Sequence, residues 1–225
     1  RNMGPNKDYL ENIRKLATEN NIVLIFDECS SCFRQNYGGL HKYYGVNPDM
    51  AIFGKALGNG YAITSIIGRR NIMDAAQSTF ISSTFWTERI GPTAALATLK
   101  AMQEEKSWEQ ITKSGKYIRN LWRKISDANS IKINQMGIPA LSTYQFESKD
   151  NLKYKTFISQ EMLKKGYIAT TGIYLSLAHT HEILDKYAEH LNDLFIIISK
   201  CEKGSQKIDD MLDNEVCHTG FKRLN

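Results

Sequence analysis

The sequence predicts an α/β protein in which a mostly parallel sheet with helices is followed by a smaller α+β C-terminal domain. Two observations lead to this prediction. Short apolar runs follow an amphipathic helix and stop at polar residues, which is typical of buried strands in a parallel sheet. Beyond about residue 104, helical and strand patterns are mixed. We therefore expect domains at residues 1–104 and 105–225.

The first part alternates helix and strand. Apolar residues recur at helical spacing after Asp8, and the run from Ile22 to Phe26 is apolar and rich in β-branched residues, so we expect a strand covered on both faces. Pro92 fits the first turn of a long helix. The remaining expected elements are strands over 49–53 and 62–68 and a helix over 70–77.

The second part is predicted from the same periodicities. Strand and helix patterns are mixed along this part, which is α+β in character. The expected elements are helices over 108–128, 152–165 and 180–201 and strands over 131–135, 141–146 and 173–178.

Composition excludes several classes of protein. Hydrophobic residues make up 42% of the 225 residues and charged residues 24%, which does not fit a disordered or collagen-like chain. The net charge of +5 is spread along the sequence, so nucleic acid is not an expected partner. No apolar run is long enough for a membrane span. With four cysteines and no signal peptide, a cytoplasmic protein is expected. Because the chain opens at Arg1, we also expect that an earlier portion precedes it.

Asp27 and Lys55 are the strongest candidates for chemistry. Asp27 ends one predicted strand and Lys55 closely follows the next, and α/β sheets place their sites at strand ends. A lysine flanked by glycines beyond an apolar strand can lose part of its hydration, which favours a nucleophilic amine. The alternative is a turn-capping aspartate and a solvated lysine. A carboxylate and a lysine on neighbouring strand ends match the needs of pyridoxal phosphate (PLP), whose ring nitrogen is held protonated by an acid.

Four stretches of sequence resemble one enzyme family. In order they are LIFDECSSCFR, YYGVNPDMAIFGKALGNGYAITSIIGRR, PTAALATLKAM and YLSLAHTHEILDKY. Together they resemble the second half of class III PLP-dependent aminotransferases, most of all the glutamate-1-semialdehyde aminomutase group. The resemblance implies the large-domain fold of fold-type I PLP enzymes. It also implies that the other half of the family chain supplies a phosphate-binding loop and an aromatic residue stacked on the cofactor ring.

The resemblance assigns roles to individual residues. Lys55 corresponds to the lysine that forms the Schiff base, Asp27 to the partner of the pyridine nitrogen, and Cys29 to a residue packed on the ring. Ser30 stands where some relatives place a glutamine beside the ring hydroxyl. Thr87, five residues before Pro92, corresponds to a threonine that reaches the cofactor phosphate of the neighbouring subunit, with Thr84 as the alternative.

The resemblance implies an aminotransferase that takes a small-molecule amino donor and acceptor and works as a homodimer. An intramolecular aminomutase and a non-catalytic homologue are the alternatives. The sequence departs from the family at Cys32, where a glycine is usual, and in the loop STFWTERIGP, whose Trp86, Glu88 and Arg89 are bulky or charged. That loop argues against assuming the aminomutase substrate.

Other candidate ligands have structural interpretations. Cys29 and Cys32 could form a metal or redox pair, although no histidine lies at ligand spacing. His179 and His181 precede an acidic helix start, which favours a capping turn over a zinc site. The candidates for gripping a substrate carboxylate are Arg34, Arg69, Arg70 and Arg89.

Overall fold

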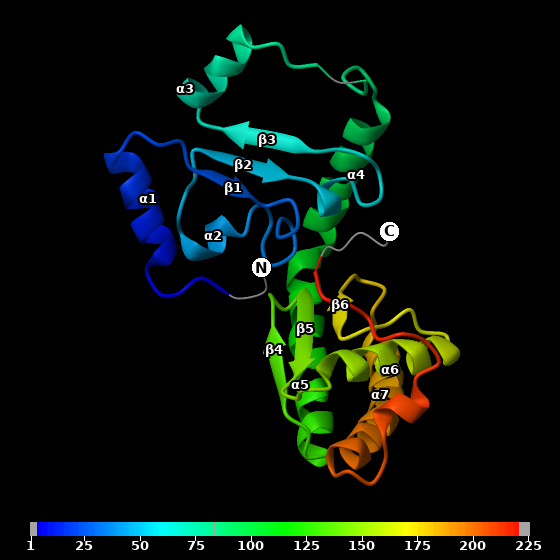
Figure 1. The fold of residues 1–225 in the computed structure, drawn as a ribbon. Coiled ribbons are helices and arrows are strands. Elements are labelled where there is room, and N and C mark those ends of the chain that lie inside the picture. Colours follow the sequence, from blue (N-terminus) through cyan, green and yellow to red (C-terminus); the bar gives the residue numbers. More distant parts are fainter. Residues whose placement is uncertain (1–3, 83, 221–225) are drawn as a thin grey trace. The chain divides into compact units, whose positions relative to one another are not determined.

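The computed structural model describes residues 4–82 and 84–220 (Figure 1). The chain divides into two compact units, an N-terminal unit, Gly4–Thr112, and a C-terminal unit that begins at Lys113. The division falls inside helix α5 (Ser107–Ala128). A domain boundary at residue 104 stays a prediction.

A three-stranded sheet forms the centre of the N-terminal unit. Its order is β1 (Ile25–Asp27), β2 (Met50–Phe53), β3 (Ser65–Gly68). β1 and β2 are parallel, as expected, whereas β3 is antiparallel to β2. The connection from β2 to β3 holds only the 3₁₀ helix η1 (Lys55–Leu57), and a parallel pairing would require a longer crossover.

The predicted helices of the N-terminal unit are present in order, and a short helix, α2, was not predicted. The helices are α1 (Tyr9–Glu19), α2 (His41–Tyr44), α3 (Arg70–Met73) continued by the 3₁₀ helix η2 (Asp74–Ser78), and α4 (Ile90–Glu105). α4 begins before Pro92 because the carboxylate of Glu88 accepts hydrogen bonds from the backbone N–H of Ile90 (2.6 Å) and of Gly91 (3.1 Å). These N–H groups have no partner inside a helix, and a negative charge stabilises that end. Glu88 therefore has a local structural role.

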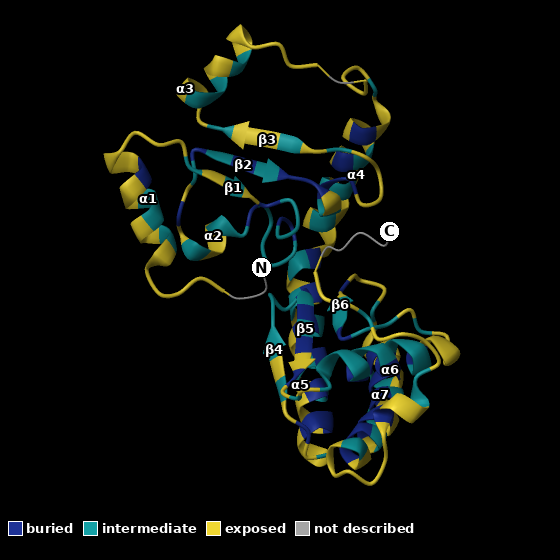
Figure 2. Ribbon diagram, viewed as in Figure 1, coloured by how far each residue is buried: buried dark blue, intermediate teal, exposed yellow. Residues whose placement is uncertain are grey.

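The two outer strands of this sheet are exposed (Figure 2). Ile25 on β1 is 50% exposed and Ile67 on β3 is 61% exposed. The prediction that the first strand is covered on both faces is therefore wrong for this chain, because Ile25 and Asp27, which point to one face, are exposed, as are Ile22 and Val23 before them.

A small core joins the sheet to α4. Phe53 of β2 packs beside Phe33, with ring centroids 5.9 Å apart, and Ala95 comes from α4. Cys32 is fully buried in this cluster, so its thiol fills volume in the core. The core fixes the segment that follows β1 against the end of β2.

Asp49 lies just before β2, at the end of the sheet away from Asp27, and bonds to α1 and to the residues that flank β1 and β3. Its carboxylate accepts hydrogen bonds from the Leu24 N–H and from Arg14, both at 2.8 Å, and lies 3.1 Å from Arg69. The Leu24 N–H bond and the Arg14 guanidinium hold the pKa of Asp49 below its usual value.

The C-terminal unit packs helices on an antiparallel sheet. Its order is β4 (Ile133–Met136), β5 (Leu141–Phe146), β6 (Gly172–Tyr174), with helices α5, α6 (Asn151–Lys164) and α7 (His181–Glu202) and the 3₁₀ helix η3 (Ile208–Met211). All predicted elements are present. β6 is shorter than expected because the Ser176 N–H donates to His179 Nδ1 at 3.0 Å instead of to a neighbouring strand.

Aromatic rings fill the core of this unit. The ring of Tyr144 lies 4.8 Å from Trp122, 5.6 Å from Phe146 and 6.1 Å from Phe195, measured between centroids. Burial of such side chains is the main favourable term in folding.

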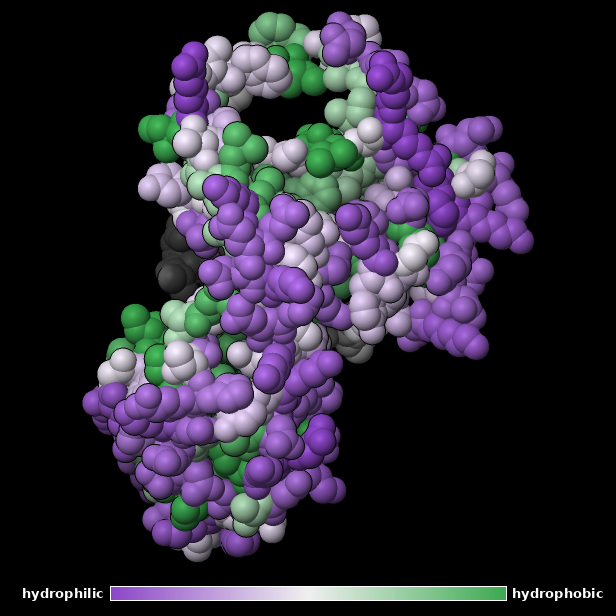
Figure 3. Space-filling view, turned by 180° about the vertical axis from the view of Figure 1, so that it is seen from behind, coloured by the Kyte–Doolittle hydropathy of each residue, from purple (hydrophilic) through white to green (hydrophobic). Residues whose placement is uncertain are grey.

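The surface of the protein is mainly polar on the side drawn in Figure 3, where hydrophilic side chains predominate. Within the described residues, no helix is both long and apolar enough to cross a membrane.

Candidate active site

Asp27 and Lys55 lie at the same edge of the sheet. Asp27 is the last residue of β1, and Lys55 follows the end of β2 by two residues. Since these strands are parallel and Asp27 pairs with Ile52, their carboxyl ends meet. The Asp27 carboxylate also accepts a hydrogen bond from the Cys29 N–H at 3.0 Å, which accords with a turn-capping role, and both side chains remain exposed.

Lys55 occupies an unusual backbone conformation. Its φ of +44° is in the left-handed region, which costs a residue with a β-carbon about 1–2 kcal/mol. Gly54 precedes it in an extended conformation, and a Cβ at Gly54 would lie only 2.6 Å from Cys29 Sγ. The chain therefore needs glycine here for Cys29 to lie beside the backbone that presents Lys55.

Ser30 contacts the amine of Lys55. The Nζ of Lys55 donates a hydrogen bond to Ser30 Oγ, which joins residues 25 positions apart. The structure thus brings Asp27, Cys29, Ser30 and Lys55 into one cluster through hydrogen bonds and the contact of Cys29 with Gly54.

The turn after β1 is fixed by bonds from several directions. The Glu28 carbonyl accepts from the Ser31 N–H (3.1 Å) and the Cys32 N–H (2.9 Å). Arg34 Nε donates to the Ser30 carbonyl at 2.8 Å. Arg34 therefore braces the turn through this bond, whatever else it contacts.

Cys32 is a structural thiol in this turn. Its Sγ lies 3.5 Å from the Gly54 carbonyl, and burial raises its pKa. A protonated, buried thiol is a poor metal ligand. Among the residues with described positions, no group of three or more His, Cys, Asp or Glu side chains is arranged to hold a metal ion.

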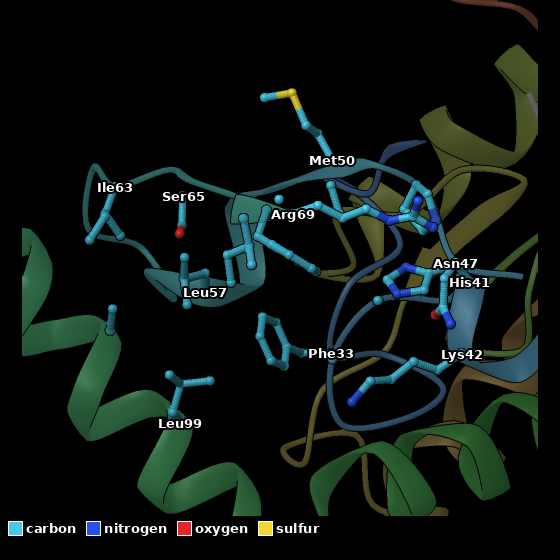
Figure 4. A pocket seen from close by; sticks show the side chains of 18 of the residues that line it. Phe33, His41, Lys42, Asn47, Met50, Leu57, Ile63, Ser65, Arg69 and Leu99 are labelled. Carbon is cyan, nitrogen blue, oxygen red and sulfur yellow. The ribbon is translucent and has the colours of Figure 1, made fainter. Parts of the chain in front are cut away.

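A cavity of about 860 Å³ lies on the face of the sheet opposite to the one that carries Asp27 (Figure 4). Ala51 and Phe53 line it from β2, and Ser65 and Ile67, their partners on β3, line it beside them. Because side chains alternate along a strand, Asp27, paired with Ile52, faces the opposite side. This cavity is therefore distinct from the cluster at Lys55, and none of the four cluster residues lines it.

Two further predicted residues lie in the loop before α4. Thr84 and Thr87 are exposed, and in the described part of the chain no hydrogen bond joins either to Lys55. Their role toward a neighbouring subunit stays a prediction. The first residue of the STFWTERIGP loop, Ser83, lies outside the described residues.

The other candidate ligands have structural roles. Thr180 caps α7, where its Oγ1 accepts from the Ile183 N–H at 3.4 Å, and His181 stacks on Tyr117 with centroids 4.2 Å apart. The predicted capping turn is confirmed. Arg69 pairs with Asp49, and Arg70 begins α3.

Sequence reasoning missed Glu28 and His41. Glu28 is a buried carboxylate next to Asp27, and its partner His41 lies 13 positions further along the chain. The signal was available in part, since consecutive strand residues point to opposite faces and one of two adjacent acids must then enter the unit.

Comparison with known proteins finds relatives whose sequences match most of this chain. The chain is 30% identical over 208 residues to glutamate-1-semialdehyde 2,1-aminomutase of Methanocaldococcus jannaschii, covering 85% of this chain and 49% of that protein. It is 34% identical over 152 residues to 3-aminobutyryl-CoA aminotransferase of Cloacimonas acidaminovorans, covering 67% and 37%. The chain spans about half the length of the curated aminomutases it matches.

The fold has solved counterparts. The FumI protein of Sphingopyxis sp. MTA144, in its PLP internal aldimine form, superposes with a TM-score of 0.80 at 23% identity, covering 91% of this chain and 50% of that one. This likeness confirms the predicted fold class. The sequence model described as aminotransferase class-III matches residues 2–211, which include all four cluster residues. The chain therefore belongs to the class-III aminotransferase family, as its four quoted stretches predict.

Proposed function

We propose that this protein is a PLP-dependent aminotransferase that moves an amino group from a small-molecule donor to a keto or aldehyde acceptor. The observation that carries the proposal is the placement of Asp27 and Lys55 at the carboxyl ends of adjacent parallel strands, within the part of the chain that matches the family. An acid for the ring nitrogen and an amine for the aldehyde are the two groups that this cofactor requires.

The residues present fit the cofactor. Lys55 offers a primary amine with a hydroxyl partner, and Asp27 offers an exposed carboxylate whose backbone contact fixes its direction. Cys29, held against Gly54, offers an apolar surface for a flat ring. Ser30 is the group placed to meet a polar substituent near the amine.

Each of these side chains has a distinct task. When bound, PLP supplies an electron sink for the electron pair left by the substrate Cα–H bond. Lys55 Nζ would bind the aldehyde group and, as a free amine, would take up and return the proton of the substrate Cα. Asp27 would supply the negative charge for the ring nitrogen, and this charge would stabilise the electron-poor ring in the transition state.

An intramolecular aminomutase is the second candidate, because relatives named glutamate-1-semialdehyde 2,1-aminomutase match at 30% and 33% identity. An aminomutase returns nitrogen to a neighbouring carbon of the same substrate and needs no separate donor. Turnover that depends on an added amino donor supports the aminotransferase, and turnover of a single substrate without one supports the aminomutase.

The proposal also includes a homodimer and a cytoplasmic location. Thr87, or Thr84 in its place, would reach the cofactor phosphate of a second subunit in a homodimer. The four cysteines are free thiols, which agrees with a reducing cytoplasm.

Reduction with borohydride tests the cofactor site. The intact protein, loaded with PLP, is reduced and digested, and the peptide that carries the pyridoxyl group is sequenced. The label is expected on Lys55. Lys55→Ala should lose the label and turnover, whereas Lys15→Ala, an exposed lysine paired with Glu19, should keep both. A label elsewhere, or turnover by Lys55→Ala, would refute the assignment, and no label at all would favour a non-catalytic homologue.

A further inference from the structure

Glu28 is a buried carboxylate that the proposed reaction does not use. It is 4% exposed, and both of its oxygens have partners. Oε1 accepts from the His41 N–H at 2.7 Å and lies 3.0 Å from His41 Nδ1, and Oε2 accepts from Ser31 Oγ. Burying a carboxylate costs free energy that such partners only offset, so a buried pair is weak evidence for stability and calls for another role.

The backbone of Glu28 belongs to the turn beside Lys55. Its N–H donates to the Ile52 carbonyl at 2.9 Å, and its carbonyl accepts from Ser31 and Cys32. Fixing the Glu28 side chain therefore fixes the start of the turn that carries Cys29 to Gly54 and Ser30 to Lys55.

His41, the partner of Glu28, lies on the cavity face of the sheet. His41 opens α2, its side chain is 11% exposed, and it lines the cavity that lies opposite Asp27. Its ring also lies against Phe26 of β1, with centroids 6.2 Å apart. The imidazole therefore touches β1 and the turn at once, without contacting the cluster at Lys55.

Gly39 makes room for this pair. A Cβ at Gly39 would lie 2.4 Å from the His41 ring and 3.1 Å from Glu28 Oε1. A methyl group there must displace the imidazole. Gly4, by contrast, has no atom closer than 3.9 Å to such a Cβ, so the same substitution there is harmless.

We propose that Glu28 and His41 are positioning residues, whose buried pair holds the turn at residues 28–32 so that Ser30 meets the Lys55 amine. The proposal rests on the proposed function for the role of the amine, and it assigns no contact with substrate or cofactor to either residue. The pair acts from the cavity face, through the backbone of β1 and the turn.

Four variants of the intact protein test this. His41→Leu keeps bulk but cannot donate from its side chain, His41→Gln restores a donor, Gly39→Ala displaces the ring, and Gly4→Ala is the matched control. In PLP-loaded protein, His41→Leu and Gly39→Ala should lower the visible circular dichroism of the cofactor. They should lower kcat by about tenfold or more, since misplacement from a distance has such effects. KM should stay near its original value, and His41→Gln should recover most of both losses.

A merely structural pair predicts a different result. If His41→Leu lowers the melting temperature but leaves the dichroism and kcat unchanged, the proposal is wrong. If His41→Leu does not fold, Glu28→Gln, which keeps the volume of the side chain, carries the same comparison.

Cofactor-free protein separates this proposal from the proposed function. The rate at which an acylating reagent modifies Lys55 is measured against Lys15 in the same sample. Loss of the Ser30 contact should change the ratio of the two rates in His41→Leu and Gly39→Ala but not in Gly4→Ala. An unchanged ratio refutes the positioning role even if PLP binds at Lys55, and a changed ratio supports it even if PLP does not.

Discussion

The carboxylates of Asp27 and Glu28, adjacent at the end of β1, serve opposite faces of the sheet. Asp27 pairs with Ile52 and stays exposed beside the Lys55 cluster, whereas Glu28 is buried against His41 on the cavity face. One dipeptide therefore supplies the proposed acid for the cofactor and the anchor of the turn that follows. The two roles can be separated by substitution, because the side chains share no partner.

Asp27→Asn should retain PLP yet slow proton abstraction, because the amide keeps an oxygen for the Cys29 N–H but carries no negative charge for the ring nitrogen. The loss in kcat should be about a hundredfold or more. Rapid-mixing absorbance of the first half-reaction measures it. Asp74→Asn, an exposed aspartate in η2, is the control. Unchanged kinetics in Asp27→Asn would mean that another acid serves the ring nitrogen.

Asp49→Asn should change how stability depends on pH. Since the pKa of Asp49 is lowered in the folded protein, its contribution is fully present above the ordinary aspartate pKa of about 3.9 and is lost as pH falls through the lower folded pKa. At neutral pH the variant should lose about 1–3 kcal/mol of unfolding free energy, as hydrogen bonds to a charged group are removed. Urea unfolding between pH 7 and acidic pH tests both points. A parallel acid dependence in the two proteins would contradict the assignment.

Cys32 should react far more slowly than Cys29 with iodoacetamide. Cys32 is fully buried and its pKa is raised, so little thiolate is present and reagent cannot approach it. Mass spectrometry of cofactor-free protein after timed alkylation measures both rates. In urea the rates should converge. Equal rates in the folded protein would show that the turn after β1 opens readily.

Gly115→Ala should destabilise the C-terminal unit although alanine favours helix. The gain in helix propensity is about 1 kcal/mol. A Cβ at Gly115 in α5, however, would lie 2.1 Å from the Pro139 carbonyl oxygen, a backbone atom that cannot rotate away. The clash should outweigh the gain, so that the urea midpoint falls. Ser114→Ala, its neighbour in α5, is the control for helix propensity, and a raised midpoint in Gly115→Ala would contradict the steric argument.

Local pattern predicted most of the fold. The helices follow apolar periodicity, and β5 spans the predicted residues because its alternating side chains bury one face. The direction of β3 and the exposure of β1 were not predictable in this way. The direction of β3 depends on which strands become neighbours, and the exposure of β1 depends on which elements pack on each face of the sheet; apolar runs encode neither.

The candidate site was predictable only in part. Strand ends and family resemblance identified Asp27 and Lys55, and the resemblance added Cys29 and Ser30. The Glu28–His41 pair depends on a contact across 13 residues and on the space left by Gly39, which spacing alone does not reveal. The left-handed backbone at Lys55 is likewise a product of tertiary packing around Gly54.

The unpaired edges of β1 and β3 affect the tendency of this polypeptide to aggregate. Within the described residues neither edge strand has a partner on its outer side, and each presents unpaired backbone groups beside exposed isoleucine side chains. Such edges template the addition of strands from other copies. At rising concentration the 225-residue polypeptide should therefore form thioflavin-binding particles.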